Sequence, residues 1–250
     1  MTEARPLPDV ELSVVVPAHN SAAVLRRTVD RLVERLAGTT AEVLVVENGS
    51  TDGTAALARE LESDGLPRVR ALTSPTGMGE ALRAGIRAST GRRVLLTADD
   101  LPFGFDDLDR AAELGTEPTL VIGSKAHPDS QVDRGSVRSL STWGFRTLRR
   151  LLLSSRVGDS QGTLLADGAW LRALLPRIEA PGFLFSTEVC YAAELQRAQV
   201  VEVPVRLAPD HGPKESTVRV QDVWLMGAGL LALRRRRRVL AEPTAPGTPA

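Results

Sequence analysis

Two adjacent carboxylates, Asp99 and Asp100, end an apolar run that begins at Val94, and Pro102 follows them. A buried strand of this kind would carry both side chains to the edge of a sheet, where they can meet solvent and a ligand. Carboxylate oxygens suit Mg²⁺ or Mn²⁺, and such an ion can hold a diphosphate. Taken alone, the pair is more typical of a polar loop that merely ends a strand, so its role depends on what the rest of the chain places beside it.

The composition is that of an ordinary globular protein. The 250 residues, 42% of them hydrophobic and 25% charged, fit one α/β domain or one domain with a short appendage. Basic and acidic residues both number 31, so no overall positive charge favours nucleic acid as a partner. The single cysteine, Cys190, excludes an internal disulfide and fits a reducing compartment. The N-terminus lacks a signal-peptide pattern and no apolar run reaches the roughly 20 residues that span a bilayer, so we expect a cytoplasmic protein.

Short apolar strands alternate with amphipathic helices through the first hundred residues. Strands are predicted at 12–16, 43–46, 69–72 and 94–97, and helices at 21–36, 55–61 and 80–88, with Ser21 as the cap of the first helix. This alternation predicts a mainly parallel sheet, in which ligands gather at the carboxyl ends of the strands. Polar loops at 17–20, 47–52 and 99–100 follow three of these ends. Their convergence would form a nucleotide site, and chance convergence of polar loops is the alternative.

The second half of the chain departs from this alternation. Strands are predicted at 119–122 and 200–207, and Pro204 favours an edge position for the second of them. Helices are predicted at 138–153, 187–198 and 223–233, the last of which runs into five consecutive arginines at 234–238. The predicted organisation is an N-terminal extension at 1–11, a main domain at 12–221, an amphipathic helix with a basic run at 222–240, and a disordered tail at 241–250.

Four stretches of the first half together resemble the family-2 glycosyltransferases. They are Val-Val-Val-Pro-Ala-His-Asn at 14–20, Val-Val-Glu-Asn-Gly-Ser-Thr-Asp-Gly-Thr at 45–54, Gly-Met-Gly-Glu-Ala at 77–81, and Thr-Ala-Asp-Asp-Leu-Pro-Phe at 97–103. The last of these is similar to an Asp-x-Asp metal motif. Later pieces at 123–125, 138–141, 159–163, 188, 202–205 and 212–216 follow the order found in dolichol- or polyprenyl-phosphate sugar transferases.

The resemblance implies a GT-A fold and an inverting, metal-dependent transfer from a GDP- or UDP-linked sugar to a polyprenyl phosphate. The implied donor site consists of Pro17, Ala18, Asn20, Glu47, Asn48, Asp52, Gly77 and Asp99. The implied ligands of Mg²⁺ or Mn²⁺ are Asp99 and Asp100. The implied catalytic residues are Asp100, Asp159, Gln161 and Glu188. An acceptor phosphate needs cations and hydrogen-bond donors, and the resemblance assigns it Lys125, Arg138, Ser141, His211, Lys214 and Ser216.

The chain departs from the usual pattern of this subgroup at the metal motif. The subgroup has Thr-Asp-Ala-Asp-Leu, whereas this chain has Thr-Ala-Asp-Asp-Leu. Alignment on Leu101 places Asp100 on the second motif carboxylate and Asp99 on the alanine. A shift by one residue places Asp99 on the second carboxylate instead. In either register one carboxylate is missing or displaced, so the metal site could be weaker or differently built.

Other departures lie near the same positions. His19 and Ser21 stand where tyrosine and glutamate are common, and Pro102 stands where a glutamine often follows the metal carboxylate. The pattern Asp-Thr-Gln-Cys-Gly becomes Asp-Ser-Gln-Gly-Thr at 159–163. Lys125 replaces an arginine, which keeps the charge but loses the planar guanidinium fork.

The implied chemistry depends on the acceptor. A phosphate acceptor is already ionised near neutral pH, because its second pKa is about 6, and needs no strong base. A hydroxyl acceptor would need one, and Asp159 or Glu188 is then the candidate. Glu188 has a structural alternative, as a charge near the N-terminus of a helix.

The sequence leaves alternatives open both for the C-terminal segment and for the function. The segment around Trp224 and the arginine run either lies on an anionic membrane surface, peripheral on its inner face, or forms a core helix with a solvated basic end. The alternatives to a polyprenyl-phosphate transferase are a soluble family-2 enzyme acting on a small-molecule hydroxyl, and a protein that binds sugar nucleotides without turnover.

Overall fold

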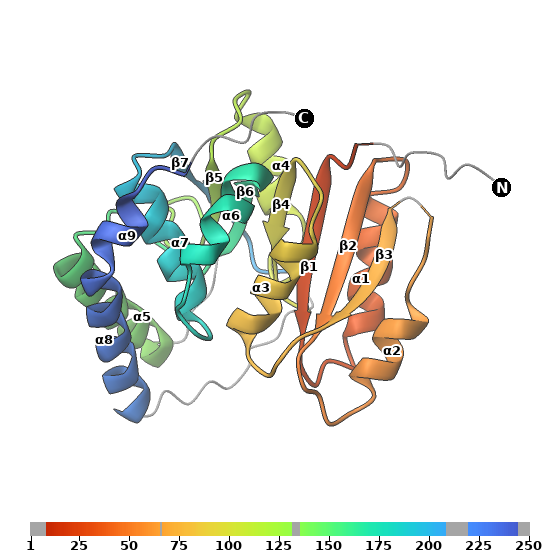
Figure 1. Ribbon diagram of the computed structural model, residues 1–250, viewed down its shortest axis with the longest axis horizontal. Helices are drawn as coiled ribbons and strands as arrows, with labels where there is room; N and C mark the ends of the chain where they lie inside the picture. Colours follow the sequence, from red (N-terminus) through yellow and green to blue (C-terminus); the bar gives the residue numbers. More distant parts are fainter. Residues whose placement is uncertain (1–8, 66, 132–135, 209–219, 245–250) are drawn as a thin grey trace.

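A seven-stranded sheet with the order β3-β2-β1-β4-β6-β5-β7 runs through the centre of the protein (Figure 1). The computed structural model describes residues 9–65, 67–131, 136–208 and 220–244. The strands are β1 (Leu12–Ala18), β2 (Ala41–Glu47), β3 (Arg68–Thr73), β4 (Arg93–Leu96), β5 (Leu120–Ser124), β6 (Thr163–Asp167) and β7 (Val200–Pro204). All are parallel except β6, which pairs antiparallel with both β4 and β5. The mainly parallel α/β sheet predicted from the sequence is therefore confirmed.

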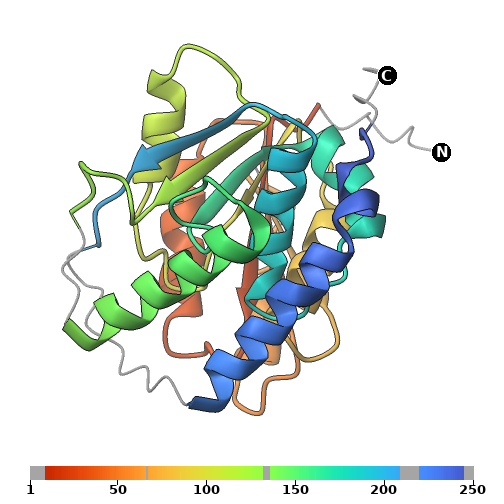
Figure 2. The ribbon, with the colours of Figure 1, turned by 90° about the vertical axis from the view of Figure 1, so that its left-hand side faces the viewer.

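Helices cover both faces of this sheet (Figure 1). On one face lie α1 (Leu25–Arg35), α2 (Thr54–Glu60) and α4 (Asp106–Glu113), and on the other lie α3 (Met78–Ala88), α6 (Gly168–Leu174) with the short 3₁₀ turn η1 (Leu175–Arg177), and α7 (Leu184–Leu195). At the β7 end of the molecule, α5 (Ser136–Leu153) packs beside α8 (Val220–Arg235), and α9 (Arg237–Ala241) follows (Figure 2). No helix among the described residues is long and apolar enough to cross a bilayer.

The strands are buried on both sides, which explains why they are continuous apolar runs in the sequence. In β1, Val14 and Val16 pack into the cluster under α1, while Val15 packs into the cluster under α3. Helix α3 lies very close to the sheet at Gly85, where an added Cβ would be only 2.3 Å from Val15 Cγ1 of β1. The central strands are thus clamped between two cores, which gives the loops at their carboxyl ends a rigid base.

The structure differs from the sequence prediction at several elements, three of which bear on the site. Helix α1 begins at Leu25, and Ser21 makes no side-chain cap to it, so the predicted capping role was wrong. Helix α7 begins at Leu184, which puts Glu188 in its second turn, and its first turn holds no acidic residue. Strand β6 was not predicted, because its apolar run is only three residues long between two polar ones. The edge position that Pro204 favoured is confirmed, since β7 ends the sheet.

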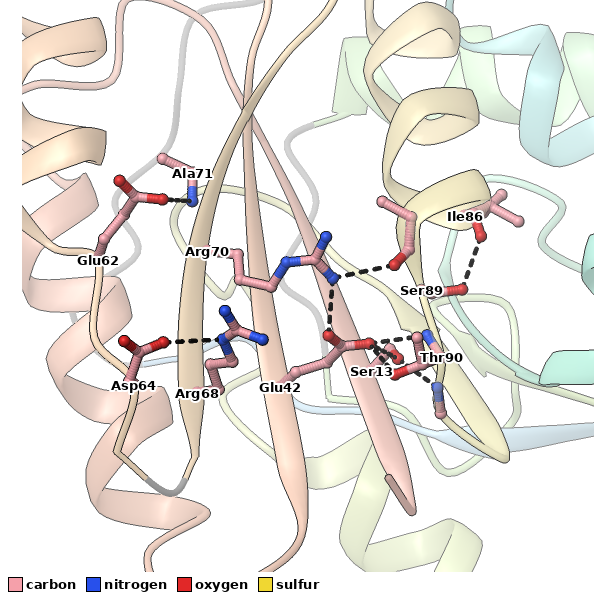
Figure 3. A network of polar contacts seen from close by, with 12 residues as sticks. Ser13, Glu42, Glu62, Asp64, Arg68, Arg70, Ala71, Ile86, Ser89 and Thr90 are labelled. Atoms are coloured by element: carbon pink, nitrogen blue, oxygen red, sulfur yellow. Dashed lines mark hydrogen bonds and ion pairs between the residues drawn. The ribbon is translucent and has the colours of Figure 1, made fainter. Parts of the chain in front are cut away.

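The amino-terminal edge of the sheet is held by one buried carboxylate, Glu42 of β2 (Figure 3). Its Oε1 accepts hydrogen bonds from the Ser13 hydroxyl at 2.7 Å and the Thr90 amide at 2.8 Å, and its Oε2 accepts from Arg70 Nη1 at 3.1 Å. Burial raises the pKa of Glu42, but these hydrogen bonds outweigh burial and hold that pKa below its usual value. Glu42 therefore joins β1, β2, β3 and the turn before β4 through its ionised form.

The outer edge of β3 is also closed. Ser63 forms an antiparallel bridge with Val69, and the Glu62 carboxylate accepts the Ala71 amide at 3.1 Å (Figure 3). Asp64 pairs with Arg68 at 3.2 Å beside them. These contacts occupy backbone groups that an open edge strand would offer to another chain.

We expect Glu42→Gln to lower the free energy of unfolding at pH 7 by about 1–3 kcal/mol, because it leaves buried donors unmatched. The folded-state pKa of Glu42 is lowered from 4.5, so its contribution is present above that value and is lost as the pH falls through the folded pKa. Urea unfolding at pH 7 and pH 4 checks both statements, with the exposed Glu113→Gln as control. A penalty that does not shrink toward acid pH would contradict the assignment.

Candidate functional site

The loops after β1, β2 and β4 meet at the carboxyl edge of the sheet, and Ser21 joins them. Its backbone N–H donates to Thr54 Oγ1 at 2.8 Å, at the start of α2. Its hydroxyl donates to Asp99 Oδ2 in the loop after β4 and accepts the His19 amide at 3.0 Å. A second bond, from Thr28 Oγ1 of α1 to the Asp99 carbonyl oxygen at 2.6 Å, holds the same loop. The three polar loops are therefore connected by direct hydrogen bonds.

The loops after β1 and β2 are also tied to each other. Asn20 adopts a φ of 51°, a left-handed conformation that asparagine tolerates better than most residues. In that conformation its Oδ1 accepts the Thr51 amide at 2.8 Å and its own N–H donates to Ser50 Oγ at 3.1 Å. His19 Nδ1 lies 3.0 Å from the Asn48 carbonyl oxygen. The predicted donor residues Asn20 and Asn48 thus lie on two loops that share one interface.

Asn48 extends this interface to the loop after β3. Its Nδ2 donates to the Ala18 carbonyl oxygen at 3.2 Å, and its Oδ1 accepts the Gly77 amide at 3.4 Å. Gly49 has a φ of 79°, and a Cβ at that position would lie 2.2 Å from Thr76 Oγ1. Only glycine permits this approach, which brings Gly77 beside the ends of β1 and β2. Of the remaining predicted donor residues, Pro17 and Ala18 are buried at the end of β1.

The two predicted donor carboxylates on the β2 loop differ in exposure. Glu47 is 8% exposed, and its Oε1 accepts the Ser50 amide at 2.5 Å. Asp52 is exposed, and the hydroxyl and amide of Thr54 hold its pKa below the usual value. Asp52 Oδ2 also accepts the Ala22 amide at 3.2 Å, so it links this loop to the β1 loop. A surface groove of about 540 Å³ begins beside Glu47 and lies between α2, β3 and α3.

Asp99 and Asp100 are both half-buried in the loop after β4. The next residue, Leu101, is buried with a φ of 44°, a conformation that costs a bulky side chain about 1–2 kcal/mol. The contact between Asp99 and Ser21 joins two positions at which the chain departs from the usual pattern. In the described part of the chain, no group of three or more His, Cys, Asp or Glu side chains is arranged so that it could hold a metal ion by itself. One or two carboxylates completed by substrate phosphates is how Mg²⁺ is commonly bound, so this donor set fits such an ion.

The second half of the site is built around Lys125, at the end of β5. Lys125 Nζ lies 3.0 Å from Asp159 Oδ2 and donates to the Gln161 carbonyl oxygen at 3.0 Å. The same ammonium lies 5.3 Å from the centroid of the Phe103 ring, in the loop that carries Asp100. The structure therefore brings together Lys125, Asp159 and Gln161, and joins them through Phe103 to the β4 loop.

Glu188 is fully buried in α7. Its Oε2 accepts the amides of Glu179 and Ala180 at 2.7 and 2.6 Å, and its Oε1 accepts from Arg236 Nη1. Burial raises the pKa of this carboxyl group, and the two amides and Arg236 oppose the rise. Its interactions are structural ones, and its catalytic role stays a prediction.

Arg236 is the one member of the arginine run that turns inward. Besides Glu188 it pairs with Glu179 at 3.1 Å and donates to the Arg177 carbonyl oxygen at 2.5 Å. The arginines at 234, 235, 237 and 238 are exposed. Helix α8 buries Leu230 and Leu233, while Leu231 stays 45% exposed. The segment thus combines a buried apolar side with a basic surface.

Several predicted acceptor residues are not described. Arg138 and Ser141 lie on α5 where the described part of the structure covers the backbone only, and His211, Lys214 and Ser216 lie outside the described residues. Sequence reasoning missed Ser21 as the residue that joins the loops. Its departure from the usual glutamate, next to a displaced Asp99, was the available signal.

Comparison with known proteins gives one family and a consistent set of relatives. The family model described as glycosyl transferase family 2 matches residues 13–173. A Drosophila melanogaster protein named dolichyl-phosphate beta-glucosyltransferase is 31% identical over 227 residues, which cover 83% of this chain and 70% of that protein. The polyprenol monophosphomannose synthase of Mycolicibacterium smegmatis is 31% identical over 214 residues, covering 77% of this chain and 75% of that one.

Solved structures share the fold at lower identity. Glucosyl-3-phosphoglycerate synthase from Mycobacterium tuberculosis, in complex with UDP, superposes with a TM-score of 0.62 at 22% identity, over 94% of this chain and 82% of that one. The same enzyme with Mn²⁺, UDP and glucosyl-3-phosphoglycerate gives a TM-score of 0.60, also at 22% identity, over 91% and 80% of the two chains.

Removing Arg236 should be costly for stability, unlike removing its neighbours. Arg236→Ala leaves the buried Glu188 without its cation, and breaking such a pair typically costs about 3–5 kcal/mol. Because the Arg236 side chain is 20% exposed, we expect the lower end of that range. Chemical unfolding measures the loss, and Arg238→Ala, an exposed member of the same run, should change stability little. Equal effects of the two substitutions would show that the ion pair is not the cause.

Proposed function

The chain belongs to glycosyl transferase family 2 and has the GT-A fold, and on that premise we propose that this glycosyltransferase moves a sugar from a nucleotide-linked donor to a polyprenyl phosphate. The observation that carries the proposal is the convergence of three strand-end loops on Ser21, beside the Asp99–Asp100 pair. The similarity to dolichyl- and polyprenol-phosphate enzymes supports the choice of acceptor.

The donor would bind across the ends of β1 and β2. Asn20 and Asp52 are exposed and offer amide and carboxylate groups suited to a base edge and to ribose hydroxyls. The buried Asn48 lies beside them, and its contacts help to hold their loops in place before a ligand arrives. Gly77, whose amide reaches Asn48, leaves the backbone open to a close approach. UDP and GDP are the two nucleotides to test.

Mg²⁺ or Mn²⁺ would be held by Asp100, with Asp99 beside it. The Asp99 carboxylate accepts from Ser21, which favours the register in which Asp100 stands on the second motif carboxylate. A divalent ion at this corner supplies charge that stabilises a departing nucleoside diphosphate. The chain's own part is to hold the β4 loop in a fixed position, through Thr28, Ser21 and the buried Leu101.

The acceptor would enter from the Lys125 side. A phosphate acceptor is ionised near neutral pH, so it can attack the anomeric carbon from the face opposite the leaving group without a strong base. Attack from that opposite face inverts the configuration at the anomeric carbon. Lys125 offers a cation to the phosphate, and Asp159 holds that ammonium at 3.0 Å. Gln161, whose carbonyl oxygen accepts from the same ammonium, lies beside the transferred sugar or the acceptor in this arrangement.

A lipid acceptor calls for contact with a membrane surface, and the β7 end of the molecule supports one. The described parts of helices α5, α8 and α9 at this end carry three exposed large apolar side chains, Leu151, Leu231 and Val239. Four exposed arginines follow on α8 and α9. Each arginine near an anionic surface contributes about 1 kcal/mol. We therefore propose peripheral attachment through this end.

Nucleotide binding should depend on the metal and on Asp100. A nucleotide at 100 times its dissociation constant should stabilise the protein by about 2.7 kcal/mol, and we expect this with UDP or GDP in the presence of Mn²⁺. Asp100→Asn should remove most of the Mn²⁺-dependent part of the stabilisation, whereas Asp129→Asn, an exposed carboxylate elsewhere, should leave it intact. Thermal unfolding with each nucleotide, with and without Mn²⁺, measures the effect.

Transfer assays separate the alternatives. Radiolabelled sugar that moves to a lipid extract supports the polyprenyl-phosphate acceptor, whereas transfer only to a soluble hydroxyl compound supports the small-molecule enzyme. Metal-dependent binding with neither transfer nor donor hydrolysis would leave a sugar-nucleotide-binding protein. Failure of every UDP and GDP sugar to bind would overturn the proposed donor site.

Membrane attachment should be salt-sensitive and should depend on exposed apolar side chains. We expect the protein to float with vesicles that contain anionic lipid and to be released by high salt, because the basic charge acts within a Debye length. Leu231→Glu should weaken flotation several-fold, since it places a charge at the apolar contact, whereas Thr116→Glu in the exposed loop after α4 should not. Absence of binding to anionic vesicles would remove this part of the proposal.

A further inference from the structure

The segment that carries Asp159 is held by three charged side chains, of which Arg149 is buried and Glu194 and Glu202 are half-buried. It spans residues 156–159, between α5 and β6. Glu194 of α7 accepts the amides of Arg156 and Val157 through one oxygen, Oε1, at 2.6 and 3.1 Å. Glu202 of β7 accepts the next two amides, from Gly158 at 2.6 Å and from Asp159 at 3.3 Å. Two carboxylates from two separate elements therefore bind four consecutive backbone N–H groups.

A guanidinium binds the opposite side of the same segment. Arg149 of α5 is 1% exposed, and its Nη2 donates to the carbonyl oxygens of Val157 and Gly158. Burial lowers the pKa of Arg149, and the negative charges of Glu194 and Glu202 act against that effect. Placing a guanidinium in a protein interior is costly unless it is well paired. Nη2 of Arg149 is paired with two carbonyl oxygens of the segment, whereas Nε and Nη1 are buried without a hydrogen-bond partner in the described part of the chain.

Gly158 makes this arrangement possible. A Cβ at this position would lie 2.9 Å from Glu202 Oε2 and 3.2 Å from the Ala126 side chain. The carboxylate of Glu202 can therefore reach two successive amides only because residue 158 has no side chain. We name the three charged side chains, Arg149, Glu194 and Glu202, the loop clamp.

The loop clamp determines where the Asp159 carboxylate lies. One oxygen, Oδ2, accepts the backbone amide of Lys125 at 3.0 Å and lies 3.0 Å from its ammonium. The other, Oδ1, accepts the Gln161 amide at 3.0 Å. Movement of the segment by one ångström would break these contacts and shift the Lys125 ammonium, which also rests on the Phe103 ring.

We propose that Arg149, Glu194 and Glu202 are positioning residues that hold the Asp159–Lys125 pair in place for the acceptor phosphate. The inference rests on the proposed function, because that function gives the pair its role. None of the three clamp residues needs to touch a substrate. They act by keeping the charge that meets the phosphate at a constant distance from the β4 loop. A misplacement of about 1 Å in such a site can cost about a hundredfold in rate.

The kinetic test uses Glu202→Gln, which keeps the shape of the side chain. It replaces one acceptor oxygen with an amide NH₂, a donor that would face a backbone N–H and could not accept from it. We expect kcat for sugar transfer to fall about tenfold to a hundredfold, with the KM for the donor within about twofold of its original value. On an Asp159→Asn background the same substitution should cause no further loss, because the pair it positions is already absent.

Glu42→Gln is the matched control. Like Glu202, Glu42 is a carboxylate that accepts a backbone N–H, but it is buried and lies at the amino-terminal edge of the sheet, away from the site. It should lower stability without changing kcat at a temperature where the protein is folded. If Glu202→Gln and Glu42→Gln affect kcat equally, or if the losses from Glu202→Gln and Asp159→Asn add, the clamp is only a structural anchor and the inference fails.

A second measurement does not require turnover. The chain contains two lysines, Lys125 and Lys214, so acylation by an amine-reactive reagent can be assigned by peptide mass spectrometry. In Glu202→Gln we expect Lys125 to be labelled several-fold faster relative to Lys214, together with faster hydrogen exchange at residues 156–159. In Glu42→Gln neither should change. Unchanged labelling and exchange in Glu202→Gln would overturn the clamp. If labelling and exchange do change in Glu202→Gln but the wild-type protein transfers no sugar, the result counts against the proposed function alone.

Discussion

The hydrogen bonds made by Ser21 are the constraint on which the site depends. Its amide donates to Thr54 and its hydroxyl donates to Asp99. A single residue of the loop after β1 therefore sets the distances from that loop to the loops after β2 and β4. Parallel strands bring such loops to one edge, but they do not by themselves fix the spacing between them. A short hydroxyl side chain that contacts a carboxylate does so here. The proposed donor-binding residues and the acidic corner at Asp99 and Asp100 are therefore held as one surface.

The β4 loop connects this surface to the other half of the molecule. Phe103 lies under the Lys125 ammonium, and the Ala208 amide donates to the Pro102 carbonyl oxygen at 2.8 Å. Two residues before Ala208, Arg206 pairs with Asp106 at the start of α4. The β4 loop is held by Ser21 and Thr28 on one side, and through Phe103 it therefore also helps to position the Lys125 ammonium on the other. At the opposite edge of the sheet, Glu42 ties β1, β2 and β3 to the turn before β4 without touching the site.

Much of this architecture could be predicted from the sequence, because the apolar runs of the first four strands and the polar loops after them are local patterns. The family could be predicted for the same reason, since its motifs are short and contiguous. Strand β6 escaped prediction because its burial comes from pairing with β4 and β5 rather than from a long apolar run. Glu188 and Arg236 are 48 positions apart in the sequence, and Glu202 and Gly158 are 44 apart. No local sequence pattern predicts contacts between residues so far apart. Ser21 was assigned to a helix cap because serine favours that position, but a carboxylate from a distant loop competed for its hydroxyl.

The most direct test is a crystal structure of the protein soaked with Mn²⁺ and UDP or GDP, with the metal located by anomalous scattering. We expect one strong peak within bonding distance of an Asp100 carboxylate oxygen and of the diphosphate, with the base between the loops after β1 and β2. Metal at another position, or nucleotide in the groove between α2, β3 and α3, would contradict the account.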